Sequence, residues 1–317
     1  MLKLIYTADI HGNESFYQRL LKKAEEENCN AVVIGGDLCG REGTTIKEKI
    51  QNQKIFLEKF MIPMFKEFKI KNKDREIYLI MGNDDFRINL EVLEKAEKNK
   101  ILKSIHKKSI KLNKEFNIAG YSFVNQTPFR LKYWEKFEFD RDKLPRQLFM
   151  EEIRSIKKEN GTIDEDLKTL KKLSNPKKTF YVIHAPPFNT KLDIITTGAH
   201  VGSKAVREFI EKEQPLLTLH GHIHESPKMS GLWQDKIGKT VCINVGSSYP
   251  EDKLNCIIVD VDNLNNKVVV SSRLNTGTSF GFFNDVDIVD FYVESPSGNA
   301  ETTRFIFKVK EKQRNEL

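Results

Sequence analysis

Two histidines separated by a single residue could bind a metal ion together. His222 and His224 follow Gly221 in the stretch Gly221-His222-Ile223-His224. Side chains two positions apart in an extended segment point to the same side, so we expect both imidazoles to face one polar cavity. Glycine leaves out a Cβ where the backbone and an ion must come close, and imidazole is a common ligand of first-row metals. Two surface histidines on a loop would have the same spacing, so this pair alone leaves both interpretations open.

Other polar side chains stand directly after apolar runs that are typical of buried strands. These runs are Leu2–Tyr6, Ala31–Ile34, Ile77–Met81 and Thr179–Ile183. In parallel β-α-β units, ligands bind beyond the carboxyl ends of the strands, so we expect the side chains that follow the runs to meet there. They are Asp9 and His11 after the first run, Asp37 after the second, Asn83, Asp84 and Asp85 after the third, and His184 after the fourth.

The elements between these runs should position them. Asn13 can cap a helix, and residues 44–69 have helical spacing with Pro63 as a kink. A short charged helix is expected at residues 90–98, and Ser203 can cap another helix. Alternating apolar residues at 101–112 and 118–123 predict strands of a second sheet, and 256–262 with 267–273 predict a hairpin.

We expect one large domain with two embellishments. Residues 1–275 form this domain, with a helical and aromatic insert at about 126–175 and a mobile lid at about 188–202. Residues 276–317 add strand-like material, such as 304–309, and a charged tail. The length of 317 residues would also allow two domains at roughly 150 residues each.

Composition excludes few function classes. The formal net charge is +7, from 52 basic and 45 acidic residues, which is a mild bias toward anions. The four cysteines lack metal-type spacing and lie in or beside apolar runs, as buried thiols in a reducing compartment do. The sequence contains no apolar run of the roughly 18 residues needed to cross a membrane, and the first strand is too short for a signal peptide. We therefore expect a cytoplasmic protein with no membrane partner and an undetermined oligomeric state.

The aromatic stretch from Phe129 to Phe139 has two interpretations. Its rings alternate with lysines and arginines, as in platforms that stack bases and bind phosphates. The flanking charges are mixed rather than uniformly basic, so an amphipathic cap over the site is favoured. Nucleic acid remains a less favoured partner than a small phosphoester.

The polar clusters together form an ordered five-part pattern. In sequence order it reads D-x-H (Asp9, His11), G-D (Gly36, Asp37), G-N-x-D (Gly82, Asn83, Asp85), H (His184) and G-H-x-H (Gly221, His222, His224). From residue 1 to about 250 the chain resembles the calcineurin-like metallophosphoesterases. The stretch from His200 to Glu225 is most similar to the Icc-related predicted phosphoesterases of that family.

The resemblance implies an α/β (α+β) fold, a four-layer sandwich of two mixed β-sheets flanked by helices, and two divalent metal ions. By the family pattern, the first ion is bound by Asp9, His11, Asp37 and His224, and the second by Asp37, Asn83, His184 and His222. Manganese is expected first, with iron, zinc or nickel as alternatives. Two such ions about 3.5–4 Å apart need a shared anionic ligand, which Asp37 can supply, and a hydroxide between them could attack phosphorus in line.

The chain departs from the family at Asp84, where many members have a histidine that helps to protonate the leaving oxygen. Asp84 could be the catalytic acid if it stays protonated, or His200 could reach in from the lid, or no protein acid exists. Alternatively, Asp84 only caps the next helix. We also expect Asn83 and His200 to contact the substrate, and turnover of esters with poor leaving groups to be weak.

Among the other candidates, His106 is expected to be surface or strand filler, and His220 either to pack or to support the ligands through a hydrogen bond. Gly246-Ser247-Ser248 could turn backbone N–H groups toward the phosphate, or be a simple loop.

The leading hypothesis is a dinuclear metal-dependent phosphoesterase that hydrolyses a small phosphodiester or phosphomonoester. A nuclease that uses the same site is the first alternative, and a non-catalytic protein-binding scaffold of the same fold is the second. The presence of every expected ligand type favours an enzyme.

Overall fold

The computed structural model describes residues 2–142, 159–251, 253–262, 267–272 and 292–293. Its first sheet has the strand order β12-β11-β1-β2-β3-β4, with β13 paired to β11. The strands are β1 (Leu2–Thr7), β2 (Ala31–Gly35), β3 (Glu76–Ile80), β4 (Lys103–Ser104), β11 (Asn255–Asp262), β12 (Lys267–Ser272) and β13 (Tyr292–Val293). The pairs from β1 to β4 are parallel, whereas β11 runs antiparallel to β1 and β12.

The second sheet has the order β5-β6-β7-β8-β10-β9. It is parallel from β6 to β10, with antiparallel strands at both edges. The strands are β5 (Ser109–Lys111), β6 (Asn117–Tyr121), β7 (Thr179–Ile183), β8 (Leu217–His220), β9 (Gln234–Ile237) and β10 (Thr240–Asn244).

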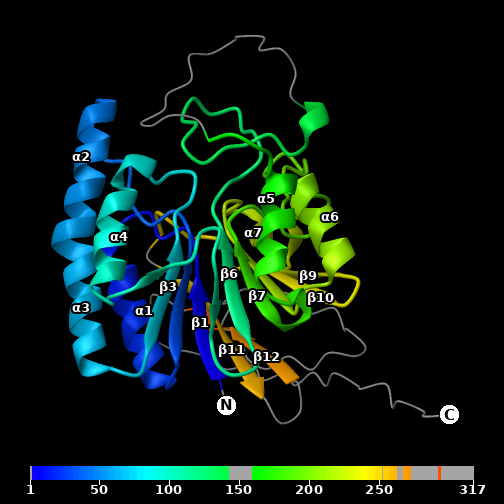
Figure 1. Cartoon of the computed structure of the whole chain (residues 1–317). Helices are drawn as coiled ribbons and strands as arrows, with labels where there is room; N and C mark the ends of the chain where they lie inside the picture. Colours follow the sequence, from blue (N-terminus) through cyan, green and yellow to red (C-terminus); the bar gives the residue numbers. More distant parts are fainter. Residues whose placement is uncertain (1, 143–158, 252, 263–266, 273–291, 294–317) are drawn as a thin grey trace.

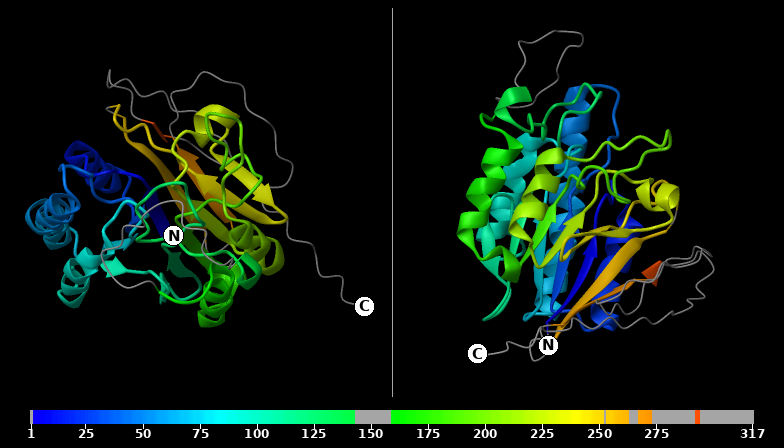
Figure 2. Two further views of the ribbon diagram at one scale, coloured as in Figure 1. Left: turned by 90° about the horizontal axis from the view of Figure 1, so that it is seen from above. Right: turned by 90° about the vertical axis from the view of Figure 1, so that its right-hand side faces the viewer.

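Helices cover the outer faces of the two sheets (Figure 1). The first sheet is covered by α1 (Glu14–Glu26), α2 (Ile46–Phe56), the π-helical turn η1 (Leu57–Met61), α3 (Ile62–Lys71) and α4 (Leu90–Lys98). The second sheet is covered by α5 (Ile163–Leu170) and α6 (Lys204–Glu213). Figure 2 shows the layers from two other sides, with the short α7 (Ser226–Ser230) lying apart from these two helices. The four-layer sandwich of two mixed sheets, and with it the predicted fold class, is confirmed.

Local chemistry accounts for where these helices begin and bend. Asn13 and Ser203 accept hydrogen bonds from backbone N–H groups in the first turns of α1 and α6, as the sequence predicts. Near Pro63 the expected irregularity is a π-helical turn, in which the N–H of Ile62 bonds to the carbonyl of Leu57. Proline lacks the N–H that would continue a regular helix, so the chain changes its hydrogen-bond spacing just before it.

Alternation along the strands produces two apolar cores. In β1, Leu4 and Tyr6 point into the core between the sheets, whereas Ile5 faces the helix layer. Both sets are completely buried, so a one-residue slip of this strand would still bury apolar side chains but would displace the residues that follow it. The four cysteines are buried as expected.

Some expected elements differ from the structure. Of residues 101–112, which the alternation assigns to the second sheet, Ser109–Lys111 does pair with β6 there, but Lys103–Ser104 pairs with β3 in the first sheet. A two-residue strand is too short for alternation to reveal its sheet. The predicted hairpin is confirmed by the pairing of β11 with β12.

Of the expected 276–317 extension, only Tyr292–Val293 is described, and the predicted strand at 304–309 lies outside the described residues. Among the described helices, none is long and apolar enough to cross a membrane.

The described residues of the 126–175 insert contain both helical and irregular segments. It contains α5 and three short 3-10 turns, at Asp140–Asp142, Lys171–Leu173 and Pro176–Lys178 at its end, and residues 143–158 lie outside the described chain. Tyr133, Trp134 and Phe139 are buried and only Phe129 of the aromatic stretch is exposed, so these buried rings cannot stack on a base.

Candidate metal centre

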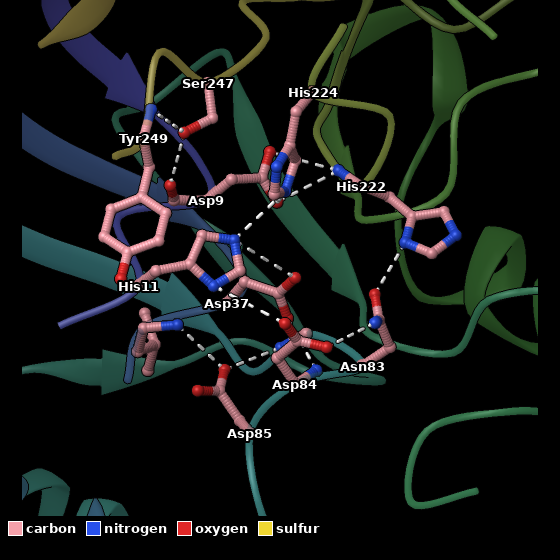
Figure 3. Close-up of polar contacts among 12 residues, drawn as sticks. Asp9, His11, Asp37, Asn83, Asp84, Asp85, His222, His224, Ser247 and Tyr249 are labelled. Atoms are coloured by element: carbon pink, nitrogen blue, oxygen red, sulfur yellow. Dashed lines mark hydrogen bonds and ion pairs between the residues drawn. The ribbon is translucent and has the colours of Figure 1, made fainter. Parts of the chain in front are cut away.

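The polar clusters meet at one edge of the sandwich. Asp9, Asp37 and Asn83 follow β1, β2 and β3 of the first sheet, while His184 and His222 follow β7 and β8 of the second. Figure 3 shows side chains from both sheets pointing toward one another. The predicted convergence beyond the carboxyl ends of parallel strands is therefore observed.

One group of donors consists of Asp9, His11, Asp37 and His224, whose ligand atoms all lie within 4.8 Å of one another. His11 Nε2 lies 3.0 Å from His224 Nε2 and 3.9 Å from Asp37 Oδ2. His224 Nε2 lies 3.6 Å from Asp9 Oδ1. These are the four residues that the family pattern assigns to the first metal ion.

A second group of donors surrounds the Asn83 amide. Its Oδ1 lies 3.0 Å from His184 Nε2 and 2.6 Å from His222 Nδ1. His184 Nε2 also lies 3.4 Å from Asp37 Oδ2. The Asp37 oxygen that faces His11 of the first group therefore faces His184 of the second as well, and Asp37 joins the two groups.

The chemistry of these donors fits divalent cations. His184 Nδ1 donates to the Gly35 carbonyl at 2.8 Å, so the Nε2 of the neutral ring presents a lone pair toward the oxygens of Asn83 and Asp37. Likewise, the two imidazole nitrogens of His11 and His224 face each other. Lone pairs that converge on one point require a cation or a proton between them, and mixed oxygen and imidazole donors suit first-row divalent metals.

Without a metal, protons supply the positive charge. Burial would lower the pKa of His184, but Asp37 and Asp9 outweigh it and raise this pKa to about 9. Burial would raise the pKa of Asp37, but the His184 and His11 rings hold it below its usual range. His222 shows the opposite response, because burial and the neighbouring His184 lower its pKa to about 3. Buried carboxylates thus stay ionised and attract cations.

The backbone reaches this geometry in conformations that side chains rarely adopt. Asp9, His11, Asp37 and His222 have φ values of 57°, 49°, 50° and 69°, all in the left-handed region, which costs about 1–3 kcal/mol per residue. The expectation that His222 and His224 share one side of an extended segment was therefore wrong. The rings turn to different donors, His222 to Asn83 and His224 to Asp9 and His11.

Gly221 permits a close approach, although not the one expected. A Cβ at this position would lie 2.6 Å from Asp9 Oδ2 and 2.7 Å from the Ala8 Cβ. The missing side chain therefore makes room for a ligand carboxylate, which also accepts hydrogen bonds from the His222 N–H at 3.1 Å.

Asp84 lies at the site and does not cap a helix. Its Oδ2 lies 3.5 Å from His11 Nδ1, its Oδ1 accepts from the Asn83 amide at 2.8 Å, and its backbone N–H donates to Asp37 Oδ1 at 2.8 Å. The same Oδ1 pairs with the Arg41 guanidinium. These contacts stabilise an ionised carboxylate, and a proton-donating role for Asp84 stays a prediction.

His200 belongs to a compact segment. Its Nδ1 lies 2.7 Å from Asp193 Oδ1, and its ring packs beside Phe188. The buried Asp193 carboxylate also accepts from the backbone N–H groups of Asn189, Thr190 and Gly202. None of the described metal donors contacts His200, so its roles as acid and substrate ligand, and the opening of residues 188–202 as a lid, stay predictions.

Residues behind the donors hold the loops in place. Asp85 accepts from the backbone N–H groups of Leu38, Cys39 and Gly82, which ties the Asp37 loop to the Asn83 loop. The Trp134 indole donates to the Asp85 carbonyl at 3.0 Å. The aromatic stretch therefore braces the Asn83 loop.

Three minor expectations are also resolved by these contacts. His220 Nδ1 lies 2.9 Å from the carbonyl oxygens on either side of His184, a supporting hydrogen bond as expected. His106 bridges to Gly120 of β6 and its ring packs against Trp134, Tyr121 and Phe123, so of the two expectations it is strand filler and not a surface residue. The N–H groups of Gly246 and Ser247 bond to Asn244 and His224, so they are not turned toward a phosphate.

Two residues at the rim were not predicted. Arg41 pairs with Asp84, and the Tyr249 ring lies 5.4 Å from the His11 ring. Arg41 lies in a polar loop after the Asp37 motif, and no spacing links it to Asp84. The proximity of Gly40-Arg41 to that motif was the available signal.

Comparison with known proteins agrees with this geometry. Residues 2–226 match the family described as calcineurin-like phosphoesterase. The chain belongs to this family. A curated relative, an uncharacterised protein of Methanocaldococcus jannaschii, is 27% identical over 267 residues, which cover 82% of this chain and 96% of the relative.

Solved structures show the same fold at low identity. This calcineurin-like phosphoesterase superposes on the protein TT1561 of Thermus thermophilus with a TM-score of 0.53 at 14% identity, covering 85% of this chain and 98% of that one. A dimetal phosphatase from Danio rerio also gives a TM-score of 0.53, at 12% identity, covering 83% of this chain and 93% of that one.

Proposed function

We propose that the protein is a metal-dependent phosphoesterase that binds two divalent ions and hydrolyses a small phosphodiester or phosphomonoester. The observation that carries this proposal is the position of Asp37, whose Oδ2 lies 3.9 Å from His11 Nε2 and 3.4 Å from His184 Nε2. One carboxylate shared by two donor groups is what two neighbouring cations require. The structurally similar protein from Danio rerio is a dimetal phosphatase, which supports the same proposal.

When bound, the two ions would supply an activated water and polarise the phosphoryl group. The chain's own contribution is to orient their ligands. The Gly35 carbonyl fixes the tautomer of His184, the Asp84 carboxylate faces His11 Nδ1, and the His222 N–H holds the Asp9 carboxylate. These partners keep the ligand nitrogens and oxygens directed inward, so little reorganisation is needed during turnover.

The proposal is tested with aryl phosphomonoesters, aryl phosphodiesters and short oligonucleotides, each assayed with manganese, nickel, zinc and iron. Hydrolysis of an aryl ester that depends on added metal would support it, and preference for oligonucleotides would identify a nuclease instead. Absence of both metal binding and hydrolysis would support the scaffold.

Asp37→Asn provides the residue-level test. It keeps the volume of the side chain but removes the shared negative charge, so manganese stoichiometry measured by calorimetry should fall and kcat should drop more than about 100-fold. Asp164→Asn, in the first turn of α5 where Asp164 pairs with Lys168, is the matched control and should keep both values. Full activity in Asp37→Asn would contradict a shared ligand.

A further inference from the structure

An exposed tyrosine lies beside the first group of metal donors. The centroid of the Tyr249 ring lies 5.4 Å from that of the His11 ring, and the two ring planes are inclined by 34° (Figure 3). His11 is buried, whereas 43% of Tyr249 is exposed. The tyrosine ring therefore covers one side of a metal donor and leaves apolar ring surface open to solvent at the rim of the site.

Exposed aromatic rings are uncommon in this protein. Among the residues that the structure describes, the exposed large aromatic side chains are those of Phe129 and Tyr249. A single exposed apolar side chain is ordinary on a protein surface and needs no function. Tyr249 differs from Phe129 because its ring contacts the imidazole of a metal donor.

A serine fixes the position of this tyrosine relative to the donors. The Tyr249 N–H donates to Ser247 Oγ at 3.2 Å, and the same hydroxyl donates to the Asp9 carbonyl at 2.9 Å. The Ser247 N–H donates to the His224 carbonyl at 3.3 Å. The backbone of Tyr249 is therefore held by the loops that carry two of the metal donors, and its ring is placed before any ligand binds.

The ring surface selects for one kind of substituent. Because His11 belongs to the first donor group, a substituent of a phosphoryl group bound there comes within reach of the neighbouring Tyr249 ring. Aromatic rings pack on one another in offset or tilted arrangements and gain more than the burial of their area alone supplies. A saturated substituent of the same size gains only from burial.

We propose that Tyr249 forms a binding subsite for a planar aromatic group, an aryl ring or a nucleobase, attached close to the phosphoryl group of the substrate. This inference rests on the proposed function and names the class of ester that the site prefers. A ring that only shields His11 from water would be indifferent to the planarity of the ligand. A hydrogen bond from the tyrosine hydroxyl would be lost in Tyr249→Phe, whereas stacking on the ring would remain.

The test measures the affinities of phenylphosphonate and cyclohexylphosphonate for manganese-loaded protein by calorimetry. Both ligands have a C–P bond that ester hydrolysis cannot break, and their rings have the same number of carbons, but only phenyl is planar. The preference for phenylphosphonate should fall about fivefold in Tyr249→Leu and be retained in Tyr249→Phe. Any difference in protonation between the two phosphonates is common to all variants and cancels in this comparison.

Phe129→Leu is the matched control, because it makes the same kind of change at the other exposed aromatic residue. It should keep the preference of the unsubstituted protein. Manganese affinity should be unchanged in Tyr249→Leu, since leucine still covers the His11 ring. An unchanged preference in Tyr249→Leu, an equal loss in Tyr249→Phe or in Phe129→Leu, or failure to bind either phosphonate would overturn the inference.

A second ligand pair distinguishes the two sources of the aromatic group. A nucleoside phosphonate is compared with the same phosphonate without its base. If Tyr249→Leu also lowers this preference, the ring accepts a nucleobase; if only the phenyl pair responds, the aromatic group is an aryl ring. Stacking without hydrolysis of any ester would leave this inference standing and remove the proposed function, whereas hydrolysis without a preference for planar ligands would do the reverse.

Discussion

The metal centre depends on side chains that are absent as much as on those that are present. Gly82 lies between two ligands, and a Cβ at this position would lie 2.2 Å from Asp37 Oδ1 and 2.6 Å from His184 Nε2. Contacts this short cannot form. A larger residue at position 82 must therefore displace the Asp37 and His184 side chains, although both residues are still present.

Gly82→Ala should therefore impair the site without removing a donor. Displacement of Asp37 and His184 should weaken manganese binding by at least tenfold, since overpacking typically costs about 1–3 kcal/mol. Calorimetry with manganese measures this change. Gly198→Ala is the control, because no atom lies within 4 Å of a Cβ there although its φ of +82° also disfavours alanine. Equal manganese affinity in both variants would show that the Gly82 loop can rearrange around the added methyl group without weakening manganese binding.

At the scale of elements, much of the site could be predicted because its strands are buried on both faces and read as apolar runs. The candidate ligands follow those runs directly, so the meeting of Asp9, Asp37 and His184 at one edge of the sandwich could be predicted from their positions alone. Arg41 was not found, because its partner Asp84 is distant in the chain and only the folded structure brings them together. The left-handed conformations of Asp9 and His222 were missed for a similar reason, since surrounding contacts impose them.

One side chain, that of Asp193, organises the segment of residues 188–202, which has no apolar periodicity. Asp193→Ala should release three backbone N–H groups and His200 Nδ1, at a cost of about 3 kcal/mol. Amide hydrogen exchange in this segment should accelerate while exchange in β7 and β8 stays slow. Asp235→Ala is the control, since Asp235 accepts one bond from the segment, from the Lys191 N–H. Uniform acceleration across the molecule would instead indicate global unfolding.

At the scale of the whole molecule, buried histidines make the fold sensitive to acid. The His106 ring packs between the second sheet and the aromatic stretch, and its Nδ1 accepts the Ser122 N–H at 3.0 Å. Burial, and then the charge of Lys107, lower its pKa from 6.5 to about 3. His220 behaves similarly, because burial lowers its pKa to about 4. Both rings are neutral in the folded protein at pH 5.

The lowered pKa values of these two histidines determine how the free energy of unfolding changes with pH. Below pH 6.5 the unfolded chain binds a proton at His106, whereas the folded protein does not until about pH 3. Stability from the neutral ring is therefore present above pH 6.5 and is lost as the pH falls toward 3, by at most about 1.4 kcal/mol per pH unit for each such histidine.

Urea unfolding at pH 6.5, 5.75 and 5.0 in the presence of a chelator measures this slope without contributions from metal release. His106→Gln should reduce the slope by about 1 kcal/mol per pH unit, whatever its effect on the free energy of unfolding at pH 7. His200→Gln serves as the control, because it makes the same substitution at a histidine whose side chain is 32% exposed. An unchanged slope in His106→Gln would mean that the ring takes up its proton in the folded state, and that the aromatic stretch opens to water before the sandwich unfolds.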